Sequence, residues 1–265
     1  MLKLSDEKLK IKHCFNRAAL SYDESDQLQF AMGEVLLQQL SEYELVASAN
    51  LLDVGCGTGK LTYELAKMFL DAKIFAVDIA DKFISLAQNR LVTMPAQVLH
   101  ADFDDMPFAD KSIDLVFSNM ALHWSVDFDK SLMEITRVLN NRGMFAFSLP
   151  IQGTFAELIA SQKPFNKVMP HQFLAVESVT KYLQKQGYDV LMLKSKQYTC
   201  YFADLMQLVR SIKNTGANYV KPQHGTMTTK KYFVQLEKNY QKFKTADTER
   251  LPLTYAIAFF IAQKR

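Results

Sequence analysis

The sequence predicts an α/β fold, in which a mostly parallel, doubly wound sheet carries helices on both faces. From about residue 50 onward, short apolar runs alternate with longer amphipathic runs. The apolar runs are rich in Val, Ile, Leu and Phe without strict alternation, which is typical of strands buried on both faces. The chain has 265 residues and 49% hydrophobic content, enough for one large domain built on a single sheet.

Five of the apolar runs are predicted to be strands, at residues 51–55, 73–78, 98–102, 113–119 and 144–149. Helices are predicted between them, at residues 61–69, 82–91 and 128–139. Helical spacing of apolar residues is clearest in the last of these segments, at Phe128, Leu132, Ile135 and Leu139. Strands that alternate with helices in this way are joined by right-handed crossovers and lie parallel in one sheet.

The flanking segments complete the predicted architecture. Residues 5–46 are predicted to be helical, with an interruption around residues 21–26. After Pro150 we expect a helix at 178–186, extended chain at 190–202, helices at 203–213 and 228–243, and a last strand at 254–262, which brings the strands to seven. The prediction is therefore one domain over residues 1–265, with an N-terminal helical segment (1–46), a ligand-binding core (50–150) and a helical lid insertion (203–250). Such a lid would lie over the strand ends, where ligands bind in sheets of this kind.

Charge and composition exclude several classes of protein. The formal net charge of +3 is too small to indicate nucleic-acid binding. No segment reaches the roughly 18 apolar residues of a membrane span, and the N-terminus lacks the apolar stretch of a secretory signal. Cys14, Cys56 and Cys200 lie far apart without a CxxC pair, so we expect neither a disulfide framework nor a metal site. These observations favour a cytoplasmic enzyme that binds neither nucleic acid nor membrane.

The sharpest local signal is a glycine-rich turn after the first predicted strand, Asp53-Val54-Gly55-Cys56-Gly57-Thr58-Gly59. Glycine lets the backbone turn tightly and approach a ligand, and the following helix N-terminus offers free N–H groups. A dinucleotide site has a third glycine where this chain has Lys60, and a P-loop has Ser or Thr where it has Leu61. The turn therefore indicates a ligand site of another kind, with a tight turn that binds nothing as the alternative.

Two acidic residues follow the next two predicted strands. Asp78 ends the second strand, where an acid suits hydrogen bonding to ribose hydroxyls, although a helix N-cap or surface acid is the alternative. Asp102 follows the third strand, where its carboxylate could accept from an adenine amino group while Phe103 packs on the ring. An ordinary loop start is the alternative there.

Residues 53–59, Asp78 and Ala101-Asp102 together resemble the successive motifs of class I S-adenosyl-L-methionine (SAM)-dependent methyltransferases, over about residues 50–150. The resemblance implies a Rossmann-like fold and SAM as cofactor, with S-adenosyl-L-homocysteine as its product. It implies that the glycines face the methionine part, that Asp78 holds the ribose, that Asp102 and Phe103 hold the adenine, and that Asp53 orients the glycine loop or the amino group. The residues expected to bind the cofactor are Asp53, Gly55, Cys56, Gly57, Gly59, Asp78, Ile79, Asp102, Phe103 and Asn119.

The flanks resemble a narrower family, the malonyl-acyl-carrier-protein O-methyltransferases of biotin synthesis. The similar stretches are residues 15–23 with Leu28-Gln29, then 118–124, 152–158, 212–218 and 251–255. The resemblance implies that a methyl group passes to the free carboxylate of a malonyl thioester, carried on acyl carrier protein or on coenzyme A. One departure is His123, where we expect a glutamine before the tryptophan.

This reaction needs no general base, since a carboxylate is already ionised at neutral pH. No nucleophile–base set stands out in the sequence, and no catalytic residue is certain. Tyr22 is a candidate as a lid residue over the cofactor, with core packing as the alternative. His123 is a candidate base, which this substrate does not require.

The acceptor side has four candidate residues. Arg210 and Lys213 lie one helical step apart in the predicted lid, and we expect Arg210 to pair with the malonyl carboxylate, because a guanidinium matches it in a bidentate way. A solvated helix face is the alternative. Trp124 and Phe173 are candidates for pocket walls, with plain core packing as the alternative.

Other functions stay open at this point. A methyltransferase of a quinone or small metabolite would share the glycine loop and would use His123 as a base. A silent SAM-binding protein would bind the cofactor and methylate nothing. A lysine-rich C-terminal half could dock an acidic carrier protein or be an ordinary solvated surface; its lysines are Lys181, Lys185, Lys194, Lys196, Lys230, Lys231, Lys238, Lys242 and Lys244.

Overall fold

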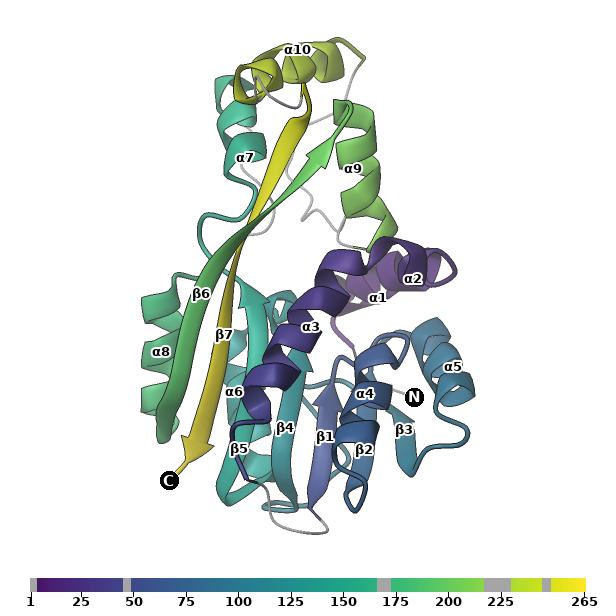
Figure 1. Ribbon diagram of the computed structural model, residues 1–265, viewed down its shortest axis with the longest axis vertical. Helices are drawn as coiled ribbons and strands as arrows, with labels where there is room; N and C mark the ends of the chain where they lie inside the picture. Colours follow the sequence, from purple (N-terminus) through teal and green to yellow (C-terminus); the bar gives the residue numbers. More distant parts are fainter. Residues whose placement is uncertain (1–3, 45–48, 166–172, 217–229, 245–248) are drawn as a thin grey trace.

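The computed structural model describes residues 4–44, 49–165, 173–216, 230–244 and 249–265. It contains a seven-stranded sheet of strand order β3-β2-β1-β4-β5-β7-β6 (Figure 1). The strands are β1 (Asn50–Val54), β2 (Lys73–Asp78), β3 (Ala96–His100), β4 (Ile113–Asn119), β5 (Leu139–Pro150), β6 (Tyr188–Phe202) and β7 (Leu251–Lys264). The first five are parallel, and β7 runs antiparallel to both β5 and β6. The predicted fold class is confirmed.

Helices cover both faces of this sheet (Figure 1). In chain order they are α1 (Asp6–Ala18), α2 (Tyr22–Ser25), α3 (Gln27–Leu40), α4 (Lys60–Met68), α5 (Asp81–Arg90), α6 (Phe128–Val138), α7 (Ala156–Gln162), α8 (Val176–Lys185), α9 (Leu205–Asn214) and α10 (Lys230–Tyr240). Side chains of α6 and α8 pack with Leu52 and Phe145 on one face, and side chains of α3 and α4 pack with Leu51 and Met144 on the other. Successive residues of a strand point to opposite faces, so each central strand supplies both cores and must be apolar throughout.

Three elements differ from the prediction. The interruption at residues 21–26 contains a short helix, α2, and α7 follows β5 where the sequence predicted no element. Helix α7 has only seven residues and begins after Phe155, whose φ is 61°, so helical periodicity is hard to detect there. Strand β5 begins at Leu139 rather than residue 144, because Leu139 already pairs with Ile113 of β4; the register then shifts before Met144 pairs with Leu115, and Arg142 in between has a positive φ.

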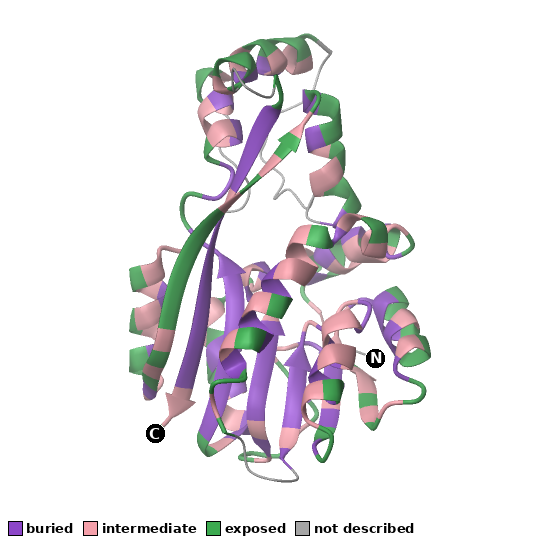
Figure 2. Ribbon diagram, viewed as in Figure 1, coloured by how far each residue is buried: buried purple, intermediate pink, exposed green. Residues whose placement is uncertain are grey.

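The long strands β6 and β7 extend past the rest of the sheet and carry a helical cap (Figure 1). The cap has its own apolar cluster, formed by Phe155, Leu158, Leu205, Leu208, Leu236, Tyr240, Leu251 and Leu253. Figure 2 shows β7 buried along most of its length while much of the edge strand β6 is exposed. The cap lies beyond the carboxyl ends of the parallel strands, and α9 contacts α2 there.

The predicted division of the chain stays a prediction. Within the predicted lid, residues 217–229 and 245–248 lie outside the described residues, as do residues 1–3 and 45–46 of the predicted N-terminal segment. None of the described helices is long and apolar enough to cross a membrane.

Candidate functional site

A pocket lies at the carboxyl ends of β1, β2 and β4, beneath the N-terminal helices. Part of its wall consists of predicted site residues, namely Tyr22, Gly55, Gly57, Asp78, Ile79, Asp102, Phe103, Asn119 and Trp124. The remaining wall was not predicted and consists of Lys8, Ile11, Phe15, Val77, Phe83, Ala101, Met120 and Ala121. The structure thus brings together residues that are up to about a hundred positions apart in the chain, at the edge where parallel sheets bind ligands.

The glycine loop forms the floor of the pocket at the end of β1. Gly55 has a φ of 76°, and a Cβ on it would lie 2.3 Å from the Cβ of Ala121, so only glycine fits. Gly57 has a φ of 55°, and a Cβ there would meet nothing within 4 Å. Because Gly57 also lines the pocket, its open side is space that a ligand can occupy. The loop is therefore shaped for close approach of a ligand to the backbone.

Asp78 fastens this loop to the start of the next helix. One carboxylate oxygen accepts from the backbone N–H of Gly57 at 2.9 Å, and the other accepts from that of Ala80 at 2.8 Å. Burial raises the pKa of Asp78, and these backbone hydrogen bonds act in the opposite direction. The N-cap of α5 is Ala80, so the N-cap alternative for Asp78 is wrong. A carboxylate has about four acceptor sites, so Asp78 keeps acceptor capacity for a ligand.

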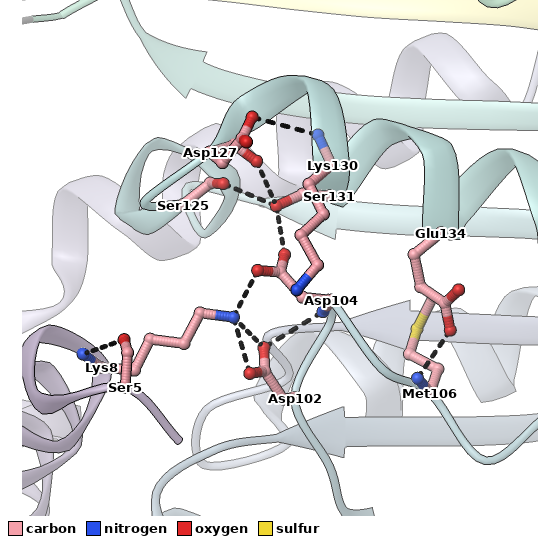
Figure 3. Close-up of polar contacts among 10 residues, drawn as sticks. All are labelled: Ser5, Lys8, Asp102, Asp104, Met106, Ser125, Asp127, Lys130, Ser131 and Glu134. Atoms are coloured by element: carbon pink, nitrogen blue, oxygen red, sulfur yellow. Dashed lines mark hydrogen bonds and ion pairs between the residues drawn. The ribbon is translucent and has the colours of Figure 1, made fainter. Parts of the chain in front are cut away.

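Asp102 lies in the pocket wall after the end of β3, the strand next to β2, and is paired with Lys8 of α1 (Figure 3). The Lys8 Nζ donates to both carboxylate oxygens of Asp102 at 2.6 Å and to Asp104 at 2.5 Å. The same ammonium lies 5.3 Å from the centre of the Phe103 ring. No feature of the sequence indicates this role of Lys8, because a lysine on a helix of mixed charge is normally solvated.

Asp53 lies behind the loop rather than in the pocket wall. It is 2% exposed, and its carboxylate accepts from the Thr62 hydroxyl at 2.6 Å. Burial raises its pKa from the ordinary 3.8 to about 7; the hydrogen bond from Thr62 lowers the pKa, and the charge of Asp78 raises it. Asp53 therefore braces the start of α4 against the end of β1.

The raised pKa of Asp53 predicts that the ligand-free protein loses stability as pH rises. Between pH 3.8 and about pH 7, Asp53 holds a proton in the folded protein that it has already released in the unfolded chain. The contribution of Asp53 to the unfolding free energy is thus fully present below pH 3.8 and is lost as the pH rises through about 7. In Asp53→Asn this dependence is absent, so the decline in unfolding free energy between pH 5 and pH 8 is smaller than in the wild type by about 2 to 3 kcal/mol. Urea unfolding at the two pH values measures it; equal declines would contradict the assignment.

Tyr22 forms part of the pocket roof, on α2. Its ring packs against Phe83, with centroids 4.8 Å apart. Burial, followed by the charges of Asp26, Asp78 and Asp23, raises the pKa of Tyr22, so its hydroxyl stays protonated and is unsuited to act as a base. Asp23 also accepts from the Thr58 hydroxyl at 2.6 Å, and this bond attaches α2 to the glycine loop.

Aromatic rings continue from the pocket toward the cap. Trp124 packs edge-on against Phe15 in the pocket wall, with centroids 5.3 Å apart. His123 lies outside the wall, 5.0 Å from the Trp124 ring and 6.2 Å from that of Phe173. Phe173 in turn packs against Phe155 of the cap cluster. Of the two predicted wall residues, Trp124 therefore lines the pocket and Phe173 packs with the cap.

Asn119 lies in the pocket wall at the end of β4. Its amide nitrogen donates to the backbone carbonyl of Gln29 at 2.8 Å, and its amide oxygen accepts from the Ser148 hydroxyl at 2.7 Å. The two bonds fix the orientation of the side chain, and the bond to Gln29 attaches α3 to the strand ends.

Four further candidates lie outside the pocket wall. Cys56 packs in a small apolar cluster with the inner side of α5, and burial raises the pKa of its thiol. Gly59 begins α4, close to Ala87 of α5. Arg210 and Lys213 are exposed on α9. This helix nevertheless ends beside the pocket, because Gly216 just beyond it packs against Phe15.

The charges of the pocket indicate the ligand. Asp78 and Asp102 contribute two carboxylates, and Lys8 is the one Lys or Arg among the described lining residues. Such a wall suits a ligand with hydroxyl or amino donors and a positive charge, and opposes the negative pyrophosphate of a dinucleotide. The open cradle at Gly57, the acceptors and the Phe103 ring fit an adenosine group joined to an amino acid.

The sequence is similar both to a general family model and to named proteins over nearly their whole length. A family model described as "Methyltransferase domain" matches residues 52–147. The chain is 31% identical over 260 residues to malonyl-[acyl-carrier protein] O-methyltransferase 2 of Coxiella burnetii, covering 97% of this chain and 96% of that protein. It is 30% identical to malonyl-[acyl-carrier protein] O-methyltransferase of Geobacter sulfurreducens, covering 97% and 99%.

Solved structures show the same fold at low sequence identity. YcgJ of Bacillus subtilis has a TM-score of 0.62 at 13% identity, covering 87% of this chain and 97% of that one. Geranyl diphosphate C-methyltransferase of Streptomyces coelicolor has a TM-score of 0.56 at 12% identity, covering 90% and 80%.

Proposed function

The chain belongs to the malonyl-[acyl-carrier protein] O-methyltransferase family and is a SAM-dependent methyltransferase, and we propose that it methylates the free carboxylate of a malonyl thioester. The observation that carries this proposal is the extent of the likeness. The general methyltransferase model covers residues 52–147, whereas the named relatives match 97% of the chain, including the N-terminal helices and the cap. The product is a malonyl methyl ester, which starts the pimeloyl part of biotin synthesis.

In this proposal, different pocket residues bind different parts of the cofactor. The backbone of Gly55 and Gly57 holds the amino-acid part, Asp78 accepts from the ribose hydroxyls, and Asp102 with Phe103 holds the adenine. When bound, SAM supplies a methyl group on a positively charged sulfur. The surplus of carboxylates in the wall favours this charge.

The remaining task of the protein is to align the reactants and to exclude water. The malonyl carboxylate is ionised at neutral pH and is itself the nucleophile, so no proton has to be removed. Ile11, Phe15, Tyr22 and Trp124 give the pocket an apolar roof and side wall. An apolar wall excludes water and strengthens the electrostatic interactions inside the site. Alignment of two bound groups lowers the barrier further by removing entropy from the reacting step.

Arg210 is the proposed partner of the malonyl carboxylate. It is exposed on α9, and the chain just beyond this helix packs against Phe15 of the pocket wall. An arginine on the cap can therefore meet a thioester arm that enters from the cap side. Lys213, one helical step away, adds positive charge for the same arm.

The proposed carrier is acyl carrier protein, after the names of the relatives. Part of the lysine-rich C-terminal surface is already paired within the chain, since Lys185 bonds Asp129 and Lys194 bonds Gln39. Lys181 of α8 and Lys231 and Lys238 of α10 are exposed, and they are the better candidates for docking an acidic carrier. We also propose a cytoplasmic location, because the three widely spaced cysteines suit a reducing compartment.

Replacing His123 with Ala tests the alternative of a base-dependent methyltransferase. We expect kcat with malonyl-acyl carrier protein to fall by less than about threefold, because loss of a general base would cost about 100-fold or more. Steady-state kinetics at saturating SAM measure it, with His13→Ala, at an exposed histidine of α1, as the control. A fall of the larger size would favour a substrate whose proton has to be removed.

A panel of acceptors tests the proposed substrate. The purified protein is incubated with methyl-labelled SAM and with malonyl-acyl carrier protein, malonyl-coenzyme A or acetyl-acyl carrier protein. We expect label on the malonyl carriers, with acyl carrier protein preferred, and none on the acetyl carrier, which has no free carboxylate. Equal labelling of the acetyl carrier, or none of any acceptor by a protein that binds SAM, would overturn the proposal.

A further inference from the structure

A buried lysine lies in the pocket wall beside Asp102 and Phe103, where the adenine end of the cofactor would offer it no anionic partner. Lys8 of α1 is 7% exposed, and its ammonium contacts the carboxylates of Asp102 and Asp104 within 2.6 Å. Burying a lysine is costly unless the charge is paired and hydrogen-bonded. Here the pairing is complete, and it joins α1 to the segment after β3 (Figure 3).

The two carboxylates face different surroundings. Asp104 accepts from the Ser131 hydroxyl at the start of α6, and Ser131 also contacts Ser125, so Asp104 is held by the body of the protein. The Asp102 carboxylate lines the pocket and, among the contacts described, otherwise accepts only from the backbone N–H of Asp104, at 3.1 Å. The ammonium of Lys8 is thus shared between a carboxylate in the protein body and one in the pocket.

We propose that Lys8 is a positioning residue for the cofactor site, whose ammonium holds the Asp102 carboxylate in place as the acceptor of the adenine amino group. This inference rests on the proposed function, because it requires an adenine at Asp102. Two carboxylates within hydrogen-bonding distance of the same nitrogen repel one another when that nitrogen is removed. This repulsion turns the two carboxylates apart, and Asp102 ceases to be a fixed acceptor.

The measurement compares two ligands that differ in the group on C6 of the purine and, with it, in the proton on the neighbouring N1. S-adenosyl-L-homocysteine has an amino donor on C6, and S-inosyl-L-homocysteine has an oxygen acceptor. Calorimetry gives both dissociation constants for the wild type and for Lys8→Met. We expect the wild type to prefer the adenosyl ligand and this preference to fall about tenfold in Lys8→Met. A tenfold change corresponds to the loss of one hydrogen bond to a charged group. Lys10→Met, on the exposed side of the same helix, is the control and keeps the preference.

A second variant separates positioning from simple fastening of α1. In Lys8→Met with Asp104→Asn, the cation and the competing carboxylate are both absent, so no like charge displaces Asp102 and most of the preference returns. A lysine that only fastened α1 would give an equal loss for both ligands and a further loss in the double variant, which would overturn the inference. If Lys8→Met fails to fold, the ligand preference of the double variant is compared with that of Asp104→Asn instead. A double variant that has lost the preference would then overturn the inference. A wild type that binds neither ligand would instead contradict the proposed function.

Discussion

Asp78→Asn is expected to weaken the binding of S-adenosyl-L-homocysteine by about 100-fold, or roughly 3 kcal/mol. The carboxylate of Asp78 accepts from two backbone N–H groups, those of Gly57 and Ala80, and keeps acceptor sites for the ligand. An amide has one oxygen, so its NH₂ group would face one of these two donors. The variant therefore disturbs the glycine loop and loses the charged acceptor for ribose hydroxyls at the same time.

Calorimetry with the ligand measures this change, and the unfolding temperature of the free protein shows whether the fold is kept. Asp71→Asn is the matched control, since Asp71 is an exposed acid just before the same strand. Binding by Asp78→Asn within about threefold of the wild type would show that Asp78 is only a structural brace.

Arg210→Ala is expected to raise the KM for malonyl-acyl carrier protein by about 30-fold to 100-fold, with the dissociation constant of S-adenosyl-L-homocysteine unchanged. A bidentate guanidinium–carboxylate pair contributes about 2 to 3 kcal/mol when it is shielded from water. Arg210 lies on α9 of the cap and outside the cofactor pocket, so its loss affects the acceptor alone. Steady-state kinetics with varied acceptor, together with calorimetry, separate the two effects.

Arg210→Lys keeps the charge without the planar fork, and we expect it to recover only part of the lost affinity. Lys163→Ala, an exposed cation just after α7, is the control for a general loss of positive charge. An Arg210→Ala variant that loses affinity for both substrates equally would contradict a role confined to the malonyl group.

The fold and the part of the pocket wall at the strand ends could be predicted because their signals are local. The segments that became β2 and β4 were predicted with their observed bounds, since apolar runs and the turns between them mark strands directly. The glycine run and the acids at the strand ends are likewise read from neighbouring residues. Helix α7 lacked such a signal, because a seven-residue helix shows too little periodicity.

Apart from Tyr22, the residues that the N-terminal helices contribute to the pocket could not be predicted from local signals. Lys8 meets Asp102 across 94 positions of sequence, and nothing in the α1 segment distinguishes this lysine from Lys10 or Lys12. The roles of the N-terminal helix and of the cap depend on how distant segments pack. Arg210 and Lys213 show the same limit, since the sequence predicted their helix but not its distance from the pocket wall.

One measurement tests the central claim most directly, namely the chemical position of the transferred methyl group. The protein is incubated with malonyl-acyl carrier protein and SAM labelled with carbon-13 in the methyl group, and the product is examined by intact mass and NMR. The account predicts that the carrier gains the mass of one methylene and that the labelled carbon is a methoxy carbon of an ester. A labelled carbon bonded to carbon, or a wild-type protein that binds SAM and leaves the malonyl group unchanged, would contradict it.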